Sequence, residues 1–224
     1  MNTAATPPGR TLGACVFDFD GTLVDTSGGI LESFRAAFAA CAQRPARTLT
    51  AAVIGPPLRQ TLALLADSDD AALLDRLSAA FKAHYDSQAY RLSTVFPGVP
   101  ALLEALCGLG YPLYIATNKR LHPTQLIIEH LGWRALFRGV HALDGVAPPY
   151  SDKAAMLAAV LRLEGLAAAT TLYVGDRDED GSAAAANALP FAWASWGYGG
   201  EAPTLPDCPR LDRPDDLRRL LGAA

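Results

Sequence analysis

The chain carries its strongest structural signal in Ala14-Cys15-Val16-Phe17-Asp18-Phe19-Asp20-Gly21-Thr22-Leu23-Val24-Asp25. Four apolar residues precede two carboxylates, which is typical of a buried parallel strand that delivers side chains to its carboxyl end. Asp18 and Asp20 alternate, so in an extended chain both point to one side while Phe19 points into the packing. Gly21 then permits a sharp turn. The stretch therefore predicts a strand with a polar site at its end.

Two carboxylates this close repel each other, so the pair predicts either a bound divalent ion or a shared proton. All the available ligands are oxygen atoms and no His lies nearby, which favours Mg²⁺ over Zn²⁺. A solvated Asp-Gly turn after a strand is the alternative, because both residue types are common in turns.

The composition is that of an ordinary globular protein. The chain has 224 residues, of which 50% are hydrophobic and 19% charged, enough for one core with a small inserted domain. The formal net charge is −4 and the pI is about 5.5. This acidic balance argues against nucleic acid or an anionic membrane as the main partner.

The cysteines and the N-terminus indicate a reducing compartment. Four widely spaced cysteines without a Cys-x-x-Cys pair predict free thiols rather than disulfides or a zinc site. Residues 1–11 read as a disordered tail without the apolar segment of a secretion signal. No apolar run approaches the roughly 18 residues of a membrane span. We therefore expect a cytoplasmic protein.

A block of about 65 residues after Thr26 shows only helical periodicity. Apolar residues recur there at spacings of three and four, which predicts helices from Ser27 to before Pro45, over 58–66 and over 69–89. Phe96-Pro97-Gly98 then marks a boundary. We expect an all-helical insertion over residues 27–95.

Beyond this boundary, strands and helices alternate. The pattern predicts strands over 112–117, around 140, over 171–174 and over 191–196, with helices over 99–109, 123–131, 151–163, 181–188 and 214–221. Such alternation is typical of a parallel sheet with helices on both faces. The expected fold class is therefore α/β, a doubly wound parallel, Rossmann-like sheet formed by residues 12–26 and 96–224, with an inserted all-helical domain.

Polar residues follow several of these strands, at the edge where a doubly wound sheet binds its ligands. Thr117-Asn118 ends one strand and offers a hydroxyl and an amide to a phosphoryl oxygen. Lys153 begins an apolar helix, where the helix dipole disfavours a cation, so an anion nearby would explain its position. Lys119 is the alternative for that role. Gly175-Asp176-Arg177-Asp178-Glu179-Asp180 gathers four carboxylates, which are costly to place together unless they are solvated or bind a cation.

Taken in order, these segments resemble the motifs of the haloacid dehalogenase superfamily. The first motif is Asp18-x-Asp20-x-Thr22, the second Thr117-Asn118, the third Lys153, and the fourth Gly175-Asp176-x-x-x-Asp180. The third departs from many relatives, which have Lys-Pro where this chain has Lys153-Ala154. The resemblance covers nearly all of the chain after residue 12.

The resemblance implies a division of roles among these residues. Asp18 would be the nucleophile and Asp20 the general acid and base. Mg²⁺ would be held by Asp18, the main-chain carbonyl of Asp20 and Asp176, with Asp180 in support. The phosphoryl group would be bound by Gly21, Thr117, Asn118 and Lys153. Asp178 and Glu179 would not bind the metal.

The insertion resembles the cap of the phosphoglycolate phosphatase and beta-phosphoglucomutase group, and Asp20 indicates phosphoryl chemistry rather than dehalogenation. The expected function is hydrolysis of a small, phosphoglycolate-like phosphomonoester. A phosphomutase, a pyrophosphatase or nucleotidase, and a binding module without catalysis are the alternatives. We expect a monomer or a homodimer. Substrate specificity would lie in the cap, where Arg35, Arg59 and His84 are candidates.

Overall fold

The computed structural model of the protein describes residues 12–199 and 208–221, so the predicted tail of residues 1–11 lies outside it. A six-stranded sheet forms its centre in the order β5-β4-β1-β6-β7-β8, and every pairing within it is parallel. This confirms the predicted parallel sheet. Its strands are β1 (Ala14–Phe17), β4 (Leu113–Thr117), β5 (Gly139–Ala142), β6 (Thr171–Gly175), β7 (Phe191–Ala194) and β8 (Arg210–Leu211).

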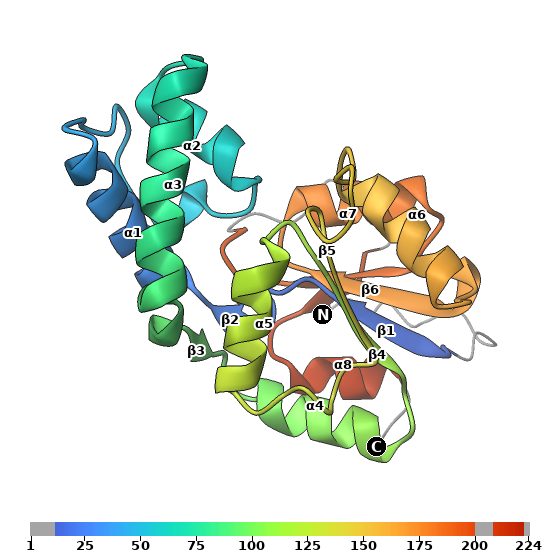
Figure 1. Cartoon of the computed structure of the whole chain (residues 1–224). Coiled ribbons are helices and arrows are strands. Elements are labelled where there is room, and N and C mark those ends of the chain that lie inside the picture. Colours follow the sequence, from blue (N-terminus) through green and yellow to red (C-terminus); the bar gives the residue numbers. More distant parts are fainter. Residues whose placement is uncertain (1–11, 200–207, 222–224) are drawn as a thin grey trace.

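Helices cover both faces of this sheet (Figure 1). Cys15 and Phe17 of β1 pack in one core cluster with helices α4 (Val99–Gly108), α5 (Leu121–His130) and α8 (Asp215–Leu220). Ala14 and Val16 belong to a second cluster with α6 (Lys153–Leu163) and α7 (Asp178–Ala186). Because successive side chains of a strand point to opposite faces, the buried run in β1 serves both clusters.

The inserted segment is helical and has an apolar core of its own. It contains α1 (Ser27–Ala40), α2 (Leu58–Ala66) and α3 (Ala71–Ser87), with short 3-10 turns at Ala51–Val53 and Ala89–Leu92. Phe34, Leu62 and Phe81 are among the residues of its separate hydrophobic cluster. The helices stand beside the carboxyl edge of the sheet (Figure 1). The predicted all-helical cap is confirmed, and its limits at residues 27 and 95 stay a prediction.

Two short strands that the sequence pattern did not predict connect the cap to the sheet domain. β2 (Val24–Asp25) and β3 (Thr94–Val95) pair antiparallel, so the chain enters and leaves the cap side by side. Two residues are too few to show an alternating pattern, and the same holds for the missed strand β8.

The observed helix ends differ from the predicted ones where side chains cap them. α3 starts at Ala71 because the Asp70 carboxylate accepts a hydrogen bond from the Ala72 amide, at 3.0 Å. α7 starts three residues before the predicted Gly181, so that Asp178, Glu179 and Asp180 form its first turn, where the helix dipole favours carboxylates.

The composition-based predictions on thiols agree with the structure. Cys15, Cys41, Cys107 and Cys208 are all free. Burial raises the pKa of the Cys15 thiol to about 12. Among the described residues, no helix is both long and apolar enough to cross a membrane.

Candidate active site

The ends of the three central strands bring the predicted site residues together. β4, β1 and β6 are neighbours in the sheet. Thr117 is the last residue of β4, and Asp18 and Asp176 directly follow β1 and β6. The Asp18 amide donates to the Val174 carbonyl oxygen at 2.8 Å, which continues the pairing of β1 and β6. Parallel strands place their carboxyl ends at one edge, so segments about 160 residues apart in the sequence meet there.

Three carboxylates form a buried acidic cluster. Asp18, Asp176 and Asp180 each contribute one oxygen atom to a group in which all atoms lie within 4.8 Å of one another. Burial raises the pKa of Asp18, Lys153 opposes this, and the charges of Asp180 and Asp176 add to it. Burial and Asp180 raise the pKa of Asp176 to about 6. The cluster is therefore costly to ionise without a cation.

Lys153 supplies one positive charge to this cluster. Its Nζ atom lies 3.3 Å from Oδ1 of Asp18 and 2.5 Å from Oδ1 of Asp180, and the residue is only 3% exposed. Burial works against its charged form, but attraction by Asp18 and Asp180 outweighs it and raises the pKa of Lys153. The position of a lysine at the start of α6 is thus explained by the anions it faces, while Asp152 caps the helix.

The three carboxylates differ in how much of their hydrogen-bonding capacity is already used. Asp180 accepts from Lys153 and Tyr173 through Oδ1, and from the Arg177 amide through Oδ2. Oδ1 of Asp18 is buried and accepts no hydrogen bond within the described part of the chain. Asp18 thus has capacity for a cation, and Asp180 is suited to hold its neighbours in place.

Oxygen donors, burial and excess negative charge together fit a hard divalent cation such as Mg²⁺. The backbone beside them is shaped to the cluster. Gly21 has φ +86°, and a Cβ atom there would overlap the Asp176 carboxylate. The same holds for Gly175 and Asp180, where the separation would be 2.5 Å. Only glycine lets the backbone pass this close.

The Asp20 side chain lies outside the acidic cluster. Its Oδ1 accepts from the Thr26 hydroxyl at 2.8 Å, and its Oδ2 lies 3.3 Å from Nζ of Lys119. The carboxylate therefore faces the cap, and any role of Asp20 in metal binding would fall to its main-chain carbonyl. The sequence did not predict Thr26 as the hydrogen-bond partner of Asp20, because a hydroxyl six residues after a carboxylate forms no recognisable local pattern.

The segment after β4 divides its contacts between the sheet domain and the cap. Oγ1 of Thr117 accepts from the Lys119 amide at 3.1 Å, so the Thr117 hydroxyl proton is available to a ligand. The side-chain nitrogen Nδ2 of Asn118 donates to the main-chain carbonyl of Gly55 in the cap at 3.1 Å and to the Glu179 carboxylate at 3.0 Å. Asn118 thus holds the cap loop here, and phosphate binding by it stays a prediction.

Lys119 and Lys153, the two lysines considered for one role, occupy different places. Lys153 faces Asp18, whereas Lys119 faces Asp20 and lies 4.5 Å from the centre of the Tyr85 ring. Burial works against the charged form of Lys119, but its interactions with Asp20 and the Tyr85 side chain outweigh this and raise the pKa of Lys119. Tyr85 packs in the apolar cluster of the cap and also lines a pocket beside Lys119. Helical spacing predicts such an apolar face but does not show that one of its residues lines a pocket.

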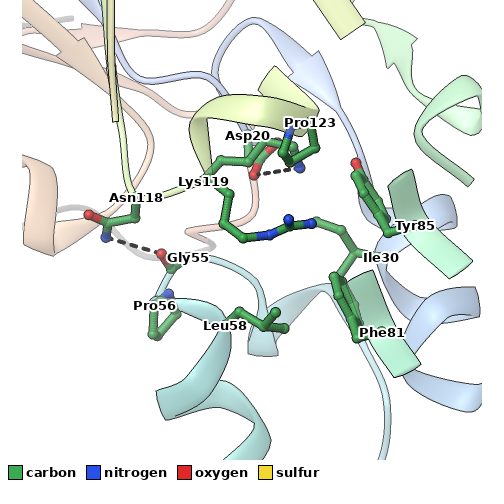
Figure 2. Close-up of a pocket in the computed structure, with 11 residues that line it drawn as sticks. Asp20, Ile30, Gly55, Pro56, Leu58, Phe81, Tyr85, Asn118, Lys119 and Pro123 are labelled. Atoms are coloured by element: carbon green, nitrogen blue, oxygen red, sulfur yellow. Dashed lines mark hydrogen bonds and ion pairs between the residues drawn. The ribbon is translucent and has the colours of Figure 1, made fainter. Parts of the chain in front are cut away.

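A small pocket lies between the cap and the sheet domain, next to Asp20 (Figure 2). Its volume is about 70 Å³, enough for only a few water molecules. It is lined by Asp20, Ile30, Gly55, Pro56, Leu58, Phe81, Tyr85, Asn118, Lys119, Arg120 and Pro123.

The three cap residues considered for specificity do not line this pocket. Arg35 is exposed, and Arg59 pairs with Asp75 at the surface. His84 lies 2.9 Å from the Ser33 hydroxyl through Nδ1 and 3.6 Å from Glu32 through Nε2, so it faces α1. Helical spacing alone could not show which side of each cap helix faces the sheet domain.

Comparison with protein families agrees with this geometry. The family described as haloacid dehalogenase-like hydrolase matches residues 15–194, from β1 to the end of β7. The chain belongs to this family. The resemblance inferred from the four motifs is thereby confirmed, and the six-stranded parallel sheet with a helical cap is the fold of a haloacid dehalogenase-like hydrolase.

Three known proteins illustrate the range of relatives of this haloacid dehalogenase-like hydrolase. Tyrosine-protein kinase PtkA of Mycobacterium tuberculosis is 30% identical over 87% of this chain, which spans 66% of that protein. Phosphoglycolate phosphatase of Xanthomonas campestris is 32% identical over 83% of this chain and 84% of that protein. The crystal structure of a predicted phosphatase from Clostridium acetobutylicum has a TM-score of 0.84 at 22% identity, covering 95% and 99% of the two chains, and shows the shared fold. Two of these three proteins carry phosphatase names, and the third carries a kinase name.

Proposed function

We propose that the protein is a Mg²⁺-dependent phosphomonoester hydrolase that works through an aspartyl-phosphate. One observation carries the proposal. The buried carboxylate of Asp18 lies 3.3 Å from Nζ of Lys153 within an acidic cluster, while the carboxylate of Asp20 is held apart, beside the pocket. A nucleophile and a general acid are thus kept in separate surroundings on one strand end.

In the first step, a carboxylate oxygen of Asp18 attacks phosphorus and forms a new P–O bond. The bond from phosphorus to the leaving oxygen breaks, and Asp20 gives its proton to that oxygen, so an alcohol departs. Lys153 faces the nucleophile, and together with the Thr117 hydroxyl it would stabilise negative charge on the phosphoryl oxygens.

In the second step, water attacks the phosphorus of the aspartyl-phosphate. Asp20, now ionised, takes a proton from this water, and the bond between phosphorus and the Asp18 oxygen breaks. Inorganic phosphate leaves and both carboxylates return to their initial states. One residue thus serves as acid and then as base, which requires its carboxylate to stay aimed at the phosphoryl group throughout.

Asp18, Asp176 and the main-chain carbonyl of Asp20 are the groups we propose for holding Mg²⁺, with Asp180 in support. When bound, the cation would offset the repulsion between the carboxylates and the substrate phosphate. The exclusion of Asp178 and Glu179 from the acidic cluster supports this assignment.

The size of the pocket supports a small leaving group. Its volume of about 70 Å³ is smaller than the roughly 150 Å³ cavity that accepts benzene in an apolar protein core. With the cap in this position, a glycolate-sized alcohol fits better than a nucleoside. We therefore propose a small phosphorylated metabolite, phosphoglycolate-like in size, as the substrate, and a cytoplasmic location as part of the same proposal.

A phosphate-release assay over a panel of phosphorylated metabolites tests the function. Activity should require Mg²⁺, and Asp18→Asn should lower kcat by about 10⁴-fold or more while the fold is kept. Asp67→Asn, on an exposed residue of the cap, is the matched control and should leave kcat unchanged. Full activity of Asp18→Asn, or in excess chelator, would contradict the proposal.

The same assay separates the alternatives. A phosphomutase would return the phosphoryl group to a second hydroxyl, so isomerised substrate would form without free phosphate. A pyrophosphatase would release phosphate mainly from pyrophosphate, and a nucleotidase mainly from nucleotides in the panel. A binding module would release no phosphate from any compound tested.

A further inference from the structure

We propose that Tyr198 is a positioning residue that keeps the Asp20 carboxylate aimed at the leaving-group oxygen, by fixing the linker through which the chain enters the cap. This inference rests on the proposed function, because it assigns the general-acid step to Asp20. Sequence reasoning gave Tyr198 no role, and it lies 178 positions after Asp20 in the chain.

The Tyr198 hydroxyl is bonded to two consecutive residues of the linker. It accepts a hydrogen bond from the Thr26 amide at 2.7 Å and donates to Oδ1 of Asp25 at 2.8 Å. The Thr26 hydroxyl in turn donates to Oδ1 of Asp20 at 2.8 Å. Thr26 is therefore bonded to Tyr198 through its amide and to Asp20 through its hydroxyl, so these hydrogen bonds form a series from Tyr198 through Thr26 to Asp20.

The backbone of Tyr198 is anchored to the acidic cluster. Its amide donates to Oδ2 of Asp176 at 2.7 Å. The glycines on either side let the loop pass directly against Asp176, since a Cβ atom on Gly197 or Gly199 would overlap that residue. One residue therefore connects a carboxylate at the end of β6 with the linker that carries Thr26.

The ring of Tyr198 also contacts the linker through which the chain leaves the cap, and an arginine that is hydrogen-bonded to the cap. Its centre lies 6.4 Å from that of Phe96, which follows β3, and 5.9 Å from the guanidinium of Arg177. Arg177 donates to two cap carbonyls, those of Ala51 and Ile54. The two connections between the domains, at β2 and β3, lie side by side (Figure 1). Tyr198 contacts both of them, through Asp25 of β2 and through Phe96 after β3.

This arrangement predicts a specific kinetic signature. Without the hydroxyl, the Thr26 amide loses its partner and the linker can shift, so the Thr26 hydroxyl no longer fixes Asp20. Nucleophilic attack by Asp18 does not use this series of bonds. The loss of kcat/KM, which covers the steps up to departure of the leaving group, should therefore fall on substrates whose leaving oxygen must be protonated, and should spare those whose leaving oxygen departs as a stable anion. Water attack on the aspartyl-phosphate uses Asp20 for every substrate, so kcat does not separate the two kinds of substrate.

The test compares Tyr198→Phe with wild-type protein on an alkyl phosphate and on p-nitrophenyl phosphate, whose leaving group needs no proton. We expect kcat/KM for the alkyl phosphate to fall by about 10- to 100-fold, less than the 10² to 10⁴ of a complete general-acid loss. The kcat/KM for p-nitrophenyl phosphate should change less than about threefold. Asp20→Asn calibrates the largest substrate-dependent effect, and Tyr111→Phe, a partly buried tyrosine outside this series, is the control.

Thr26→Val tests the same series independently and keeps the inference open to refutation if Tyr198→Phe does not fold. It should give the same dependence on the leaving group, and the double variant should lose little more than either single one, because both act through Asp20. Equal losses of kcat/KM on both substrates, or no loss of kcat/KM on either, would overturn the inference and leave the hydrolase assignment intact. Absence of phosphate release from the wild-type protein on both substrates would instead overturn the proposed function itself.

Discussion

The Nζ atom of Lys153 lies 3.3 Å from Oδ1 of Asp18, and both residues are almost completely buried. Among the described residues, this ammonium group pairs with Asp18 and Asp180, and the Arg177 guanidinium lies 3.9 Å from Asp176. One buried positive charge cannot balance three negative ones, so the cluster has a deficit that a divalent cation fills. The ion pair and the proposed metal are thus two parts of a single electrostatic arrangement.

The first prediction concerns removal of that ammonium group. Lys153→Met should abolish turnover and destabilise the metal-free protein by about 3–5 kcal/mol, because the partner carboxylates remain buried without their counter-charge. Thermal unfolding with and without Mg²⁺ measures this, and added Mg²⁺ should recover part of the stability but not the activity. Lys82→Met, on an exposed position of α3, is the control. A Lys153→Met protein as active as wild type would contradict the role given to Lys153.

The second prediction concerns the metal. Mg²⁺ at about 100 times its Kd should raise the free energy of unfolding by about 2.7 kcal/mol, which corresponds to a rise in Tm of roughly 5–10 °C for a chain of this size. Asp176→Asn should remove most of this rise because it deletes one proposed ligand. Asp178→Asn should keep it, since Asp178 lies outside the acidic cluster. A Tm that does not respond to Mg²⁺ would argue against a metal at this place.

Sequence reasoning predicted the sheet domain well because each signal there is local. A buried apolar run followed by carboxylates predicts β1, and the same logic applied to Thr117 and Asp176 places them at one sheet edge before any contact is known. The dipole argument for Lys153 also worked, because a cation at a helix start needs an anion and the nearest ones are at the strand ends.

The connection between cap and sheet domain could not be derived in this way. Thr26, Tyr85 and Tyr198 act through contacts across 6, 34 and 172 sequence positions, and none of them carries a pattern that distinguishes it from a core or linker residue. The three cap residues proposed for specificity failed to line the pocket for the same reason. Periodicity shows that a helix has an apolar face but not which neighbour that face meets.

The third prediction concerns the turn after Asp20. Gly21→Ala should destabilise the protein by about 1–3 kcal/mol and abolish Mg²⁺ binding, because φ is +86° there and a methyl group would displace the Asp176 carboxylate. Unfolding in urea and Mg²⁺ titration measure the two effects. Gly108→Ala is the control, since nothing lies within 4 Å of a Cβ atom at that helical position, and it should stabilise by about 0.5–1 kcal/mol. Normal Mg²⁺ binding by Gly21→Ala would show that Asp176 is not held in place by this contact.

The fourth prediction concerns the ion pair that joins the cap to the sheet domain. Arg120 precedes α5 and donates to both carboxylate oxygens of Asp86 on α3, at 2.9 and 2.5 Å. Because Asp86 does not line the pocket, Asp86→Asn weakens this pair without altering the lining. If the pair holds the cap in the position observed here, against the pocket, this variant should raise KM by about 5- to 10-fold, equivalent to about 1–1.4 kcal/mol, with little change in Tm.

A charge exchange separates closure from other effects of these residues. The double variant Arg120→Asp with Asp86→Arg restores the pair in reverse and should recover part of the KM lost by either single change, as expected for residues in direct contact. Arg134→Ala is the control, since Arg134 is an exposed residue whose nearest carboxylate, that of Glu129, is 3.9 Å away. Should KM remain at the wild-type value in Asp86→Asn, the pair contributes nothing to closure. Should the exchange recover nothing, Arg120 acts on the substrate directly, because it lines the pocket beside Lys119.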